Sequence, residues 1–411
     1  MSKEFPLATS PSSLLPLGFR WSSVTAGIKA SGKPDVALAV ADEPATAAAM
    51  FTRNQVTAAP VQLGKQHLKA NGGKLRAVLV NAGNANCCTG DDGLAVAKKS
   101  CVAVGEALGC VFDEVLPSST GIIGVPLPVE KLVNAVAPAT AALGGELEHA
   151  EAFATAILTT DTRRKTASAT FTVDGTPVRV WGCAKGAGMI GPQLGPPHAT
   201  MLVYLFTDIA ASASYLQRAL EAAVDDSFNA ISIDGDTSTN DTVLLLASGK
   251  SGVPVDNEVA PFFEQALAEV CKSLAYQIVD DGEGVSHVVR LEITGARTTD
   301  EARIVAKAIA NSPLCKTAWS SSDPNWGRLL SAAGKAGVAF DPTKVTVYIG
   351  NLPVFEHGTR SASYDEAKCH EAMTPREFTI GINLSQGEAV TSFVTCDLTH
   401  EYISINADYS T

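Results

Sequence analysis

Thr200 stands at an abrupt change of composition and could act as a nucleophile. Residues 185–199 read KGAGMIGPQLGPPHA, and the apolar run TMLVYLFTD follows them. Glycine and proline in such numbers normally mark a surface loop, and that interpretation stays open. The alternative is cleavage at Ala199-Thr200. A new N-terminal threonine would carry its own base, because its freed α-amine has a pKa of about 7.7–8.0 and lies within reach of the side-chain oxygen.

Self-cleavage would require the Thr200 hydroxyl to attack the carbonyl of Ala199. The glycines upstream would let the chain bend for that attack. A strand starting near Met201 would then hold the new terminus in place. The Ala-Thr pair alone does not decide the question, since it also occurs at 45–46, 139–140, 154–155 and 169–170.

Composition narrows the classes of protein. The 411 residues include 31 basic and 43 acidic side chains, for a formal charge of −12. An acidic chain without a Lys/Arg cluster is a poor candidate for binding nucleic acid or an anionic membrane. The longest apolar runs have the length of a strand, not of a membrane span. The N-terminus shows no targeting pattern. Nine scattered cysteines without a C-x-x-C pair favour a reduced protein, so we expect a cytoplasmic location.

The elements that must position Thr200 alternate between strands and helices. The pattern predicts a buried strand at 75–83, an amphipathic helix at 93–109 and a hairpin at 169–182. A further helix is expected at 214–226. The last third is rich in half-buried strands, at 287–295, 344–350 and 378–384. Strands and helices that cover one another favour a layered α/β fold over a single doubly wound sheet. We expect linkers at 186–199 and 282–284.

Ordered sequence blocks run through nearly the whole chain. They include NAGNANCCTG (81–90), SSTGIIGVPLP (118–128), LTTDTRRK (158–165), AKGAGMIGP (184–192), SFNAISIDGDTSTNDT (227–242) and DPNWGRLLSAAG (323–334). In these blocks the chain closely resembles the ornithine acetyltransferase / glutamate N-acetyltransferase family, the self-cleaving enzymes of arginine biosynthesis.

The resemblance gives Thr200 a role and divides the chain. It implies cleavage into an alpha chain, 1–199, and a beta chain, 200–411, whose strand-rich smaller domain starts at about residue 290. The expected fold is α/β: a layered αββα-type sandwich with a second, smaller α/β domain. Thr200 would take the acetyl group from N2-acetylornithine, release ornithine and pass the acetyl group to glutamate in a ping-pong reaction.

The resemblance also assigns the other site residues. Thr120 and Gly121 match the donors of the family's oxyanion hole, and glycine suits that position because its N–H can approach closely. Lys185 matches the lysine that binds the substrate carboxylate, and Glu283 the glutamate that binds an ammonium group. Thr159, with its neighbour Thr160 as the alternative, and the terminal residues Asn406 and Thr411 match the rest of the binding set.

Two further features of the sequence are a cluster of aspartates and a lengthened loop. Asp234, Asp236 and Asp241 are spaced as oxygen ligands of a metal might be, but the EF-hand glutamate is missing. We interpret DGDTSTND (234–241) as a turn network behind the site and expect neither a metal nor a cofactor. The stretch Gln193–His198 lengthens the loop between Lys185 and Thr200 relative to the family, so we expect it to affect the cleavage rate or the pose of Lys185.

Two other functions and a second acetyl donor are also compatible with these residues. The same N-terminal threonine could serve an amidohydrolase or aminopeptidase in which water accepts the acyl group. An uncleaved relative could act as a binding protein, although the intact residue set argues against that. Acetyl-CoA could serve as a second acetyl donor. The expected partners are small-molecule substrates and the chain's own fragments, as a heterotetramer of two alpha and two beta chains.

Overall fold

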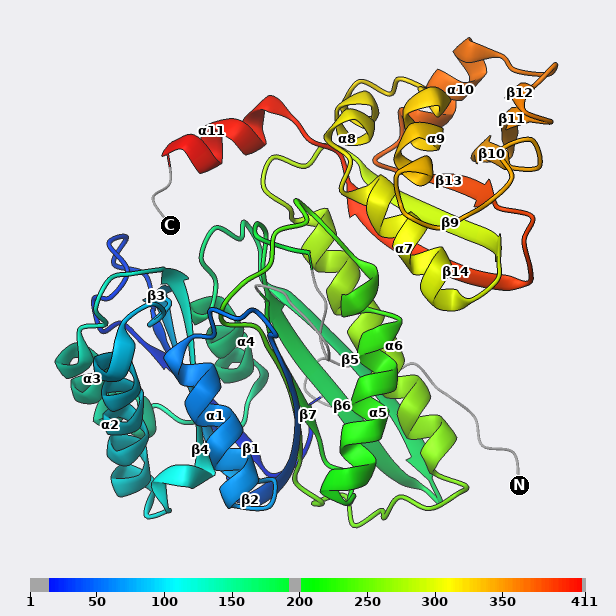
Figure 1. Ribbon diagram of the computed structural model, residues 1–411. Coiled ribbons are helices and arrows are strands. Elements are labelled where there is room, and N and C mark those ends of the chain that lie inside the picture. The colour runs from blue at the N-terminus through cyan, green and yellow to red at the C-terminus, as the bar shows by residue number, and fades with distance from the viewer. Residues whose placement is uncertain (1–14, 192–200, 409–411) are drawn as a thin grey trace.

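The computed structural model describes residues 15–191 and 201–408. Its larger domain carries the strands β1 (Phe19–Val24), β2 (Val36–Phe51), β3 (Lys74–Asn84), β4 (Val115–Ile122), β5 (Lys165–Val173), β6 (Thr176–Lys185), β7 (Leu202–Thr207) and β8 (Thr242–Ala247). The helices of this domain are α1 (Ala59–Ala70), α2 (Gly90–Leu108), α3 (Val129–Ala141), α4 (Leu147–Ala156), α5 (Ala213–Asp225) and α6 (Ala260–Asp280). Figure 1 shows α1 to α3 on one side of these strands and α5 and α6 on the other.

The long strand β2 connects two halves of the larger sheet. Its first part, from residue 36 to 41, pairs with β1, and its last part, from residue 46 to 51, pairs with β8, while β3 pairs with residues 36–40 and 45–46. The strand order is β4-β3-β2-β8-β7-β6-β5, with β1 also on β2. The register between β2 and β3 shifts between residues 40 and 45, where β8 replaces β1 as the second partner of β2. One strand therefore belongs to both halves.

The two halves pack face to face. Side chains of β1 to β3 share one apolar core with side chains of β6, β7 and β8, and the rings of Trp21 and Trp181 meet in it with centroids 5.7 Å apart. The opposite faces of the halves are covered by helices, with α1 to α3 against one and α5 and α6 against the other. The result is four layers, helix–sheet–sheet–helix, as expected for a sandwich of this class.

The apolar run after Thr200 is explained by these layers. All six residues of β7 are buried. Val203 and Leu205 face the core under α5 and α6, while Tyr204 and Phe206 face the core between the halves. A strand covered on both faces is apolar at every position, not only at alternate ones.

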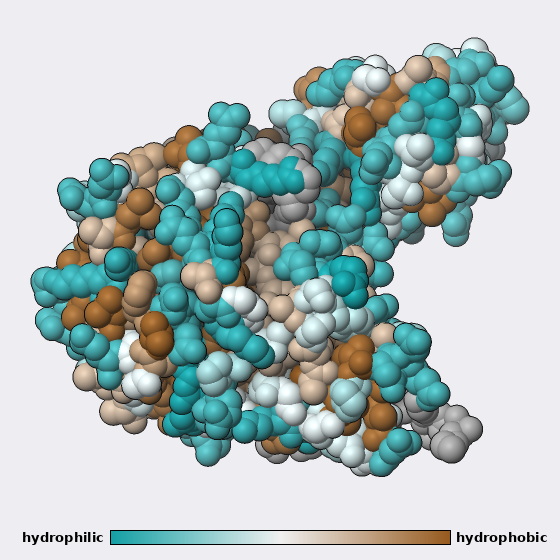
Figure 2. Space-filling view, turned by 60° about the horizontal axis from the view of Figure 1, so that its bottom comes forward, coloured by the Kyte–Doolittle hydropathy of each residue, from teal (hydrophilic) through white to brown (hydrophobic). Residues whose placement is uncertain are grey.

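The smaller domain follows α6. Its strands are β9 (Val288–Ala296), β10 (Thr346–Ile349), β11 (Leu352–Glu356), β12 (Thr359–Arg360), β13 (Glu377–Asn383) and β14 (Ala389–Cys396), in the order β12-β11-β10-β13-β9-β14. Its helices are α7 (Thr299–Ala310), α8 (Pro313–Ser320), α9 (Trp326–Gly334) and α10 (Glu366–Met373). As the alternation predicts, Val289, Leu291 and Ile293 are buried in its core. Figure 2 shows this domain projecting from the larger one.

The last helix returns to the larger domain. α11 (His400–Asp408) follows β14 and leaves the smaller sheet, and in Figure 1 it reaches over the open end of the sandwich. The predicted layered α/β fold with a smaller second α/β domain is confirmed, whereas self-cleavage stays a prediction. Within residues 15–191 and 201–408, no helix combines the length and the apolar character needed to cross a bilayer.

Candidate active site

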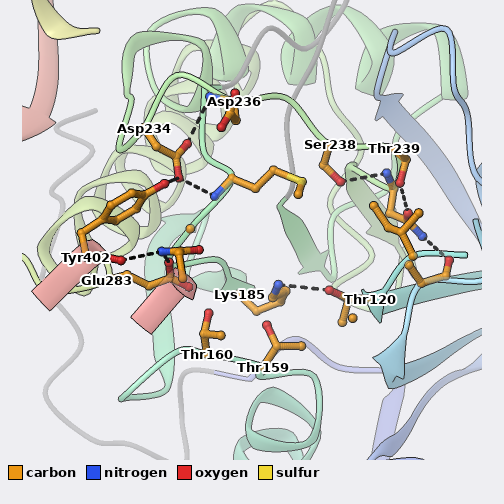
Figure 3. Close-up of a pocket in the computed structure, with 17 residues that line it drawn as sticks. Thr120, Thr159, Thr160, Lys185, Asp234, Asp236, Ser238, Thr239, Glu283 and Tyr402 are labelled. Atoms are coloured by element: carbon orange, nitrogen blue, oxygen red, sulfur yellow. Dashed lines mark hydrogen bonds between the residues drawn. The ribbon is translucent and has the colours of Figure 1, made fainter. Parts of the chain in front are cut away.

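A pocket of about 240 Å³ opens between the ends of the strands and α11. β4, β6, the loop before β8, the turn after α6 and α11 all contribute to its wall (Figure 3). The wall includes six of the residues predicted for the site, together with Thr160. These six are Thr120, Gly121, Thr159, Lys185, Glu283 and Asn406.

Thr120 and Gly121 lie near the end of β4, where that strand runs parallel to β3. Gly121 has a φ of +131°, and a Cβ atom there would lie 2.3 Å from the carbonyl carbon of Gly83. Only glycine can therefore occupy this position without moving the backbone. The carbonyl of Ser119, the residue before Thr120, accepts a 2.9 Å hydrogen bond from Nδ2 of Asn240. This bond fixes the end of the strand.

Lys185 is the last residue of β6 and its side chain is buried. Its Nζ donates a 3.1 Å hydrogen bond to Oγ1 of Thr120. Because the Thr120 oxygen accepts this bond, its own hydroxyl hydrogen is available to another acceptor. Burial lowers the pKa of Lys185, although the nearby carboxylates of Asp161, Asp241 and Glu283 act in the opposite direction.

A buried ion pair stands behind Lys185. Lys165 Nζ lies 2.6 Å from Asp161 and 2.5 Å from Asp281, and the side chains of Lys165 and Asp161 are 0 % exposed. Asp161 also accepts the amide hydrogens of Thr159, at 3.1 Å, and Gly186, at 2.6 Å. Burial alone would raise the pKa of Asp161, but the ammonium groups of Lys165 and Lys185 outweigh it and lower that pKa to about 2. Asp161 thus joins the segment carrying Thr159 to the end of β6.

Glu283 and α11 form the opposite wall. The amide of Glu283 donates to the carbonyl of Ala187 at 2.9 Å, and its Oε2 accepts from Asn406 Nδ2 at 2.8 Å. One turn away on α11, the hydroxyl of Tyr402 donates to Asp234 at 3.2 Å. The two α11 side chains that line the pocket, Tyr402 and Asn406, are therefore both hydrogen-bonded.

The loop from Asp234 to Asp241 is held by several hydrogen bonds. The Asp234 carboxylate accepts the amide hydrogens of Met189, Ile190 and Asp236 at 2.6 to 3.1 Å. Burial raises the pKa of Asp234, and these amide bonds oppose that effect. At the other end of the loop, Asp241 accepts the amide hydrogen of Met201.

Ala199, Thr200, Thr411 and the stretch Gln193–His198 lie outside the described residues. The residue after Thr200 is well placed by its neighbours. The carbonyl of Met201 accepts the amide hydrogen of Thr242 at 3.0 Å, and the next residue, Leu202, pairs with Lys185 on β6. The start of β7 is therefore fixed beside the residue whose amine contacts Thr120.

Three residues of the site were not assigned from the sequence. Asp161 stands inside the block that supplied Thr159, but its pairing with Lys165 and Lys185 depends on contacts between strands. Asn240 was treated as one member of a turn network and in fact also holds β4. Tyr402 could have been predicted from the sequence, because it precedes Asn406 by four residues and so shares its helix face.

The layered α/β fold holds a pocket lined by hydroxyl, amide and charged groups. The ArgJ family matches residues 20–411. The arginine biosynthesis bifunctional protein ArgJ of Nitratidesulfovibrio vulgaris is 42% identical over 96% of this chain and 98% of its own length. The protein of the same name from Chlorobaculum tepidum is 42% identical over 98% and 99%.

A solved structure is also similar in sequence. Ornithine acetyltransferase from Mycobacterium tuberculosis, complexed with ornithine, is 40% identical, covers 47% of this chain and 100% of its own, and superposes with a TM-score of 0.43. The chain belongs to the ArgJ family. It is an acetyltransferase of arginine biosynthesis, an ornithine acetyltransferase / glutamate N-acetyltransferase, and the predicted family is confirmed.

Proposed function

We propose that this enzyme moves the acetyl group from N2-acetylornithine to glutamate through an acetyl ester on Thr200. The observation that carries the proposal is the meeting of Thr120, Gly121, Lys185 and Glu283 around one pocket, beside the fixed start of β7. Thr200 is bonded to Met201, and the carbonyl of Met201 accepts the amide hydrogen of Thr242.

The first step is maturation. The Thr200 hydroxyl attacks the Ala199 carbonyl and the peptide becomes an ester, with the Thr200 nitrogen taking a proton. Water then hydrolyses the ester and leaves an alpha chain, 1–199, and a beta chain, 200–411. The new α-amine of Thr200 serves as the base for later steps.

Acetyl transfer follows in two halves. The Thr200 oxygen attacks the acetyl carbonyl, and the oxyanion is stabilised by the Thr120 hydroxyl and the Gly121 amide. The hydrogen bond from Lys185 to Thr120 supports this role because it leaves the threonine hydrogen free to donate. Ornithine leaves after its nitrogen takes a proton. The amine of glutamate then attacks the acetyl ester and regenerates the hydroxyl.

Charged groups hold the substrates. Lys185 would bind the α-carboxylate that the two substrates share, and Glu283 the α-ammonium group of ornithine as it leaves and of glutamate as it enters. Thr159, Asn406 and Thr411 would complete the pocket by hydrogen bonds, with Thr160 as the alternative to Thr159. Both threonines line the pocket, and the amide of Thr159 is the one bonded to Asp161.

The larger sheet supports an assembly in which the two fragments stay together. β6 and β7 would belong to different fragments, yet six residue pairs join them, so the fragments should stay together. We propose a heterotetramer of two alpha and two beta chains in the cytoplasm, working without a metal or cofactor.

The curated relatives are called bifunctional, and acetyl-CoA is the corresponding second donor to test here.

The deciding experiment is the intact mass of the purified protein with and without N-acetylornithine. We expect two fragments that begin at residue 1 and at Thr200, and an acetyl group added to the second. Glutamate should remove that group and yield N-acetylglutamate. Release of acetate at a similar rate without glutamate would assign a hydrolase instead, and an uncleaved chain without an adduct would contradict the mechanism.

A further inference from the structure

Asp236 lies on the pocket wall across from the residues assigned to the shared end of the substrates. In Figure 3 Asp234 and Asp236 lie on one side of the pocket, and Lys185, Thr159 and Thr160 lie on the other. A substrate held by its α-carboxylate at Lys185 would therefore direct its side chain toward the acidic side.

The carboxylates on this wall differ in how many hydrogen bonds they already accept from the protein. Asp234 already accepts three amide hydrogens and the Tyr402 hydroxyl, and Glu283 accepts from Asn406. Asp236 donates its amide hydrogen to Asp234, and its own exposed carboxylate accepts no hydrogen bond from any residue within 15–191 or 201–408. It is the carboxylate best able to meet a charged substrate group.

The backbone around Asp236 is fixed. Its amide is held by Asp234 at 3.1 Å. The preceding residue, Gly235, has a φ of +80°, and a Cβ atom there would lie 2.8 Å from the side chain of Asn311. The carboxylate is thus presented from a rigid turn, so its charge acts at a defined place.

One pocket must accept two different side chains in a ping-pong reaction. The side chain of N-acetylornithine ends in an ammonium group, and that of glutamate ends in a carboxylate. A fixed negative charge near this end attracts the first and repels the second. Its effect on the two half-reactions therefore has opposite signs.

We propose that Asp236 is a specificity-determining residue that attracts the side-chain ammonium of N-acetylornithine and disfavours the γ-carboxylate of glutamate. The inference rests on the proposed function, because it takes Lys185 as the site of the shared α-carboxylate. Asp236 sets which substrate the free and the acetylated enzyme prefer, and it takes no part in bond making or breaking.

The test is the KM of each substrate in Asp236→Asn, Asp236→Lys and Asp236→Glu, measured on the full cleaved enzyme. Asp236→Asn should raise KM for N-acetylornithine and lower KM for glutamate, each by about two- to fivefold, the range for an exposed charge pair. Asp236→Lys should enlarge both changes, and Asp236→Glu should bring both values back toward the parent enzyme. The differences should shrink in about 0.5 M salt, because salt screens exposed charges.

Asp174→Asn is the matched control. Asp174 is also exposed, but it lies in the turn between β5 and β6, at the opposite end of β6 from Lys185. Its KM values should equal those of the parent. Changes of the same sign for both substrates, or none, would overturn the inference while the parent still transfers acetyl groups. A parent that makes no acetylated Thr200 would instead overturn the proposed function.

Discussion

Nδ2 of Asn406 donates a 2.8 Å hydrogen bond to Oε2 of Glu283, across 123 positions of the chain. The bond connects the last described helix to the turn that follows α6. Because both residues line the pocket, the position of α11 and the orientation of the Glu283 carboxylate depend on each other.

Glu283→Gln keeps the shape of this contact and removes the charge. A hydrogen bond to a charged group is worth about 1.5–3 kcal/mol, so KM for N-acetylornithine and glutamate should rise at least about tenfold. Self-cleavage should persist. Steady-state kinetics and denaturing electrophoresis measure the two effects, with Glu269→Gln on the exposed side of α6 as the control. Loss of cleavage would move Glu283 into the maturation machinery.

Thr120→Ala tests the oxyanion site. Removing one such donor typically lowers kcat by ~10²–10³, and KM should stay within a few-fold. Thr120→Ser retains a hydroxyl for both the Lys185 bond and the oxyanion, and it should recover most of the rate. If the alanine variant raises KM and leaves kcat unchanged, Thr120 binds substrate and does not stabilise the oxyanion.

Cleavage at Ala199-Thr200 predicts two near-equal bands in place of a single 42.6 kDa chain. N-terminal sequencing of the second fragment should read Thr-Met-Leu. Thr200→Ala should remain whole. Thr155→Ala is a useful control, since Thr155 also follows an alanine and is exposed on α4, and this variant should still be cleaved. Continued scission at residue 200 in Thr200→Ala would refute self-cleavage by that hydroxyl.

Asp161, whose pKa is lowered in the fold, is expected to make the stability of the protein fall in acid. Its folded pKa of about 2 is below the ordinary 3.8, so its ionised form stabilises the fold fully above pH 3.8 and loses that effect as the pH falls toward 2. Asp161→Asn should lower the free energy of unfolding by about 3–5 kcal/mol at pH 7 and by much less near pH 2. Urea unfolding at several pH values measures this. An equal loss at both pH values would show that packing, not charge, explains the effect.

Most residues of the candidate site could be predicted from the sequence, but most of the contacts that hold these residues in place could not. Thr120, Lys185 and Glu283 stand in recognisable blocks, and the alternation of Val289, Leu291 and Ile293 predicted their strand. The ion pairs of Asp161 and the face-to-face packing of the two sheet halves depend on contacts between distant segments. Local patterns carry no signal for such contacts, because the partners are set by the topology of the sheet.

The shared strand β2 has a consequence for synthesis. Residues 46–51 must wait for residues 242–247, which leave the ribosome about two hundred residues later. At about 5–20 residues per second, this delay is roughly 10–40 s. Throughout that interval the end of β2 is an open sheet edge, the kind of edge that pairs with other chains. The nascent first half therefore exposes an edge that can pair with other chains, and a chaperone that covers this edge would limit aggregation.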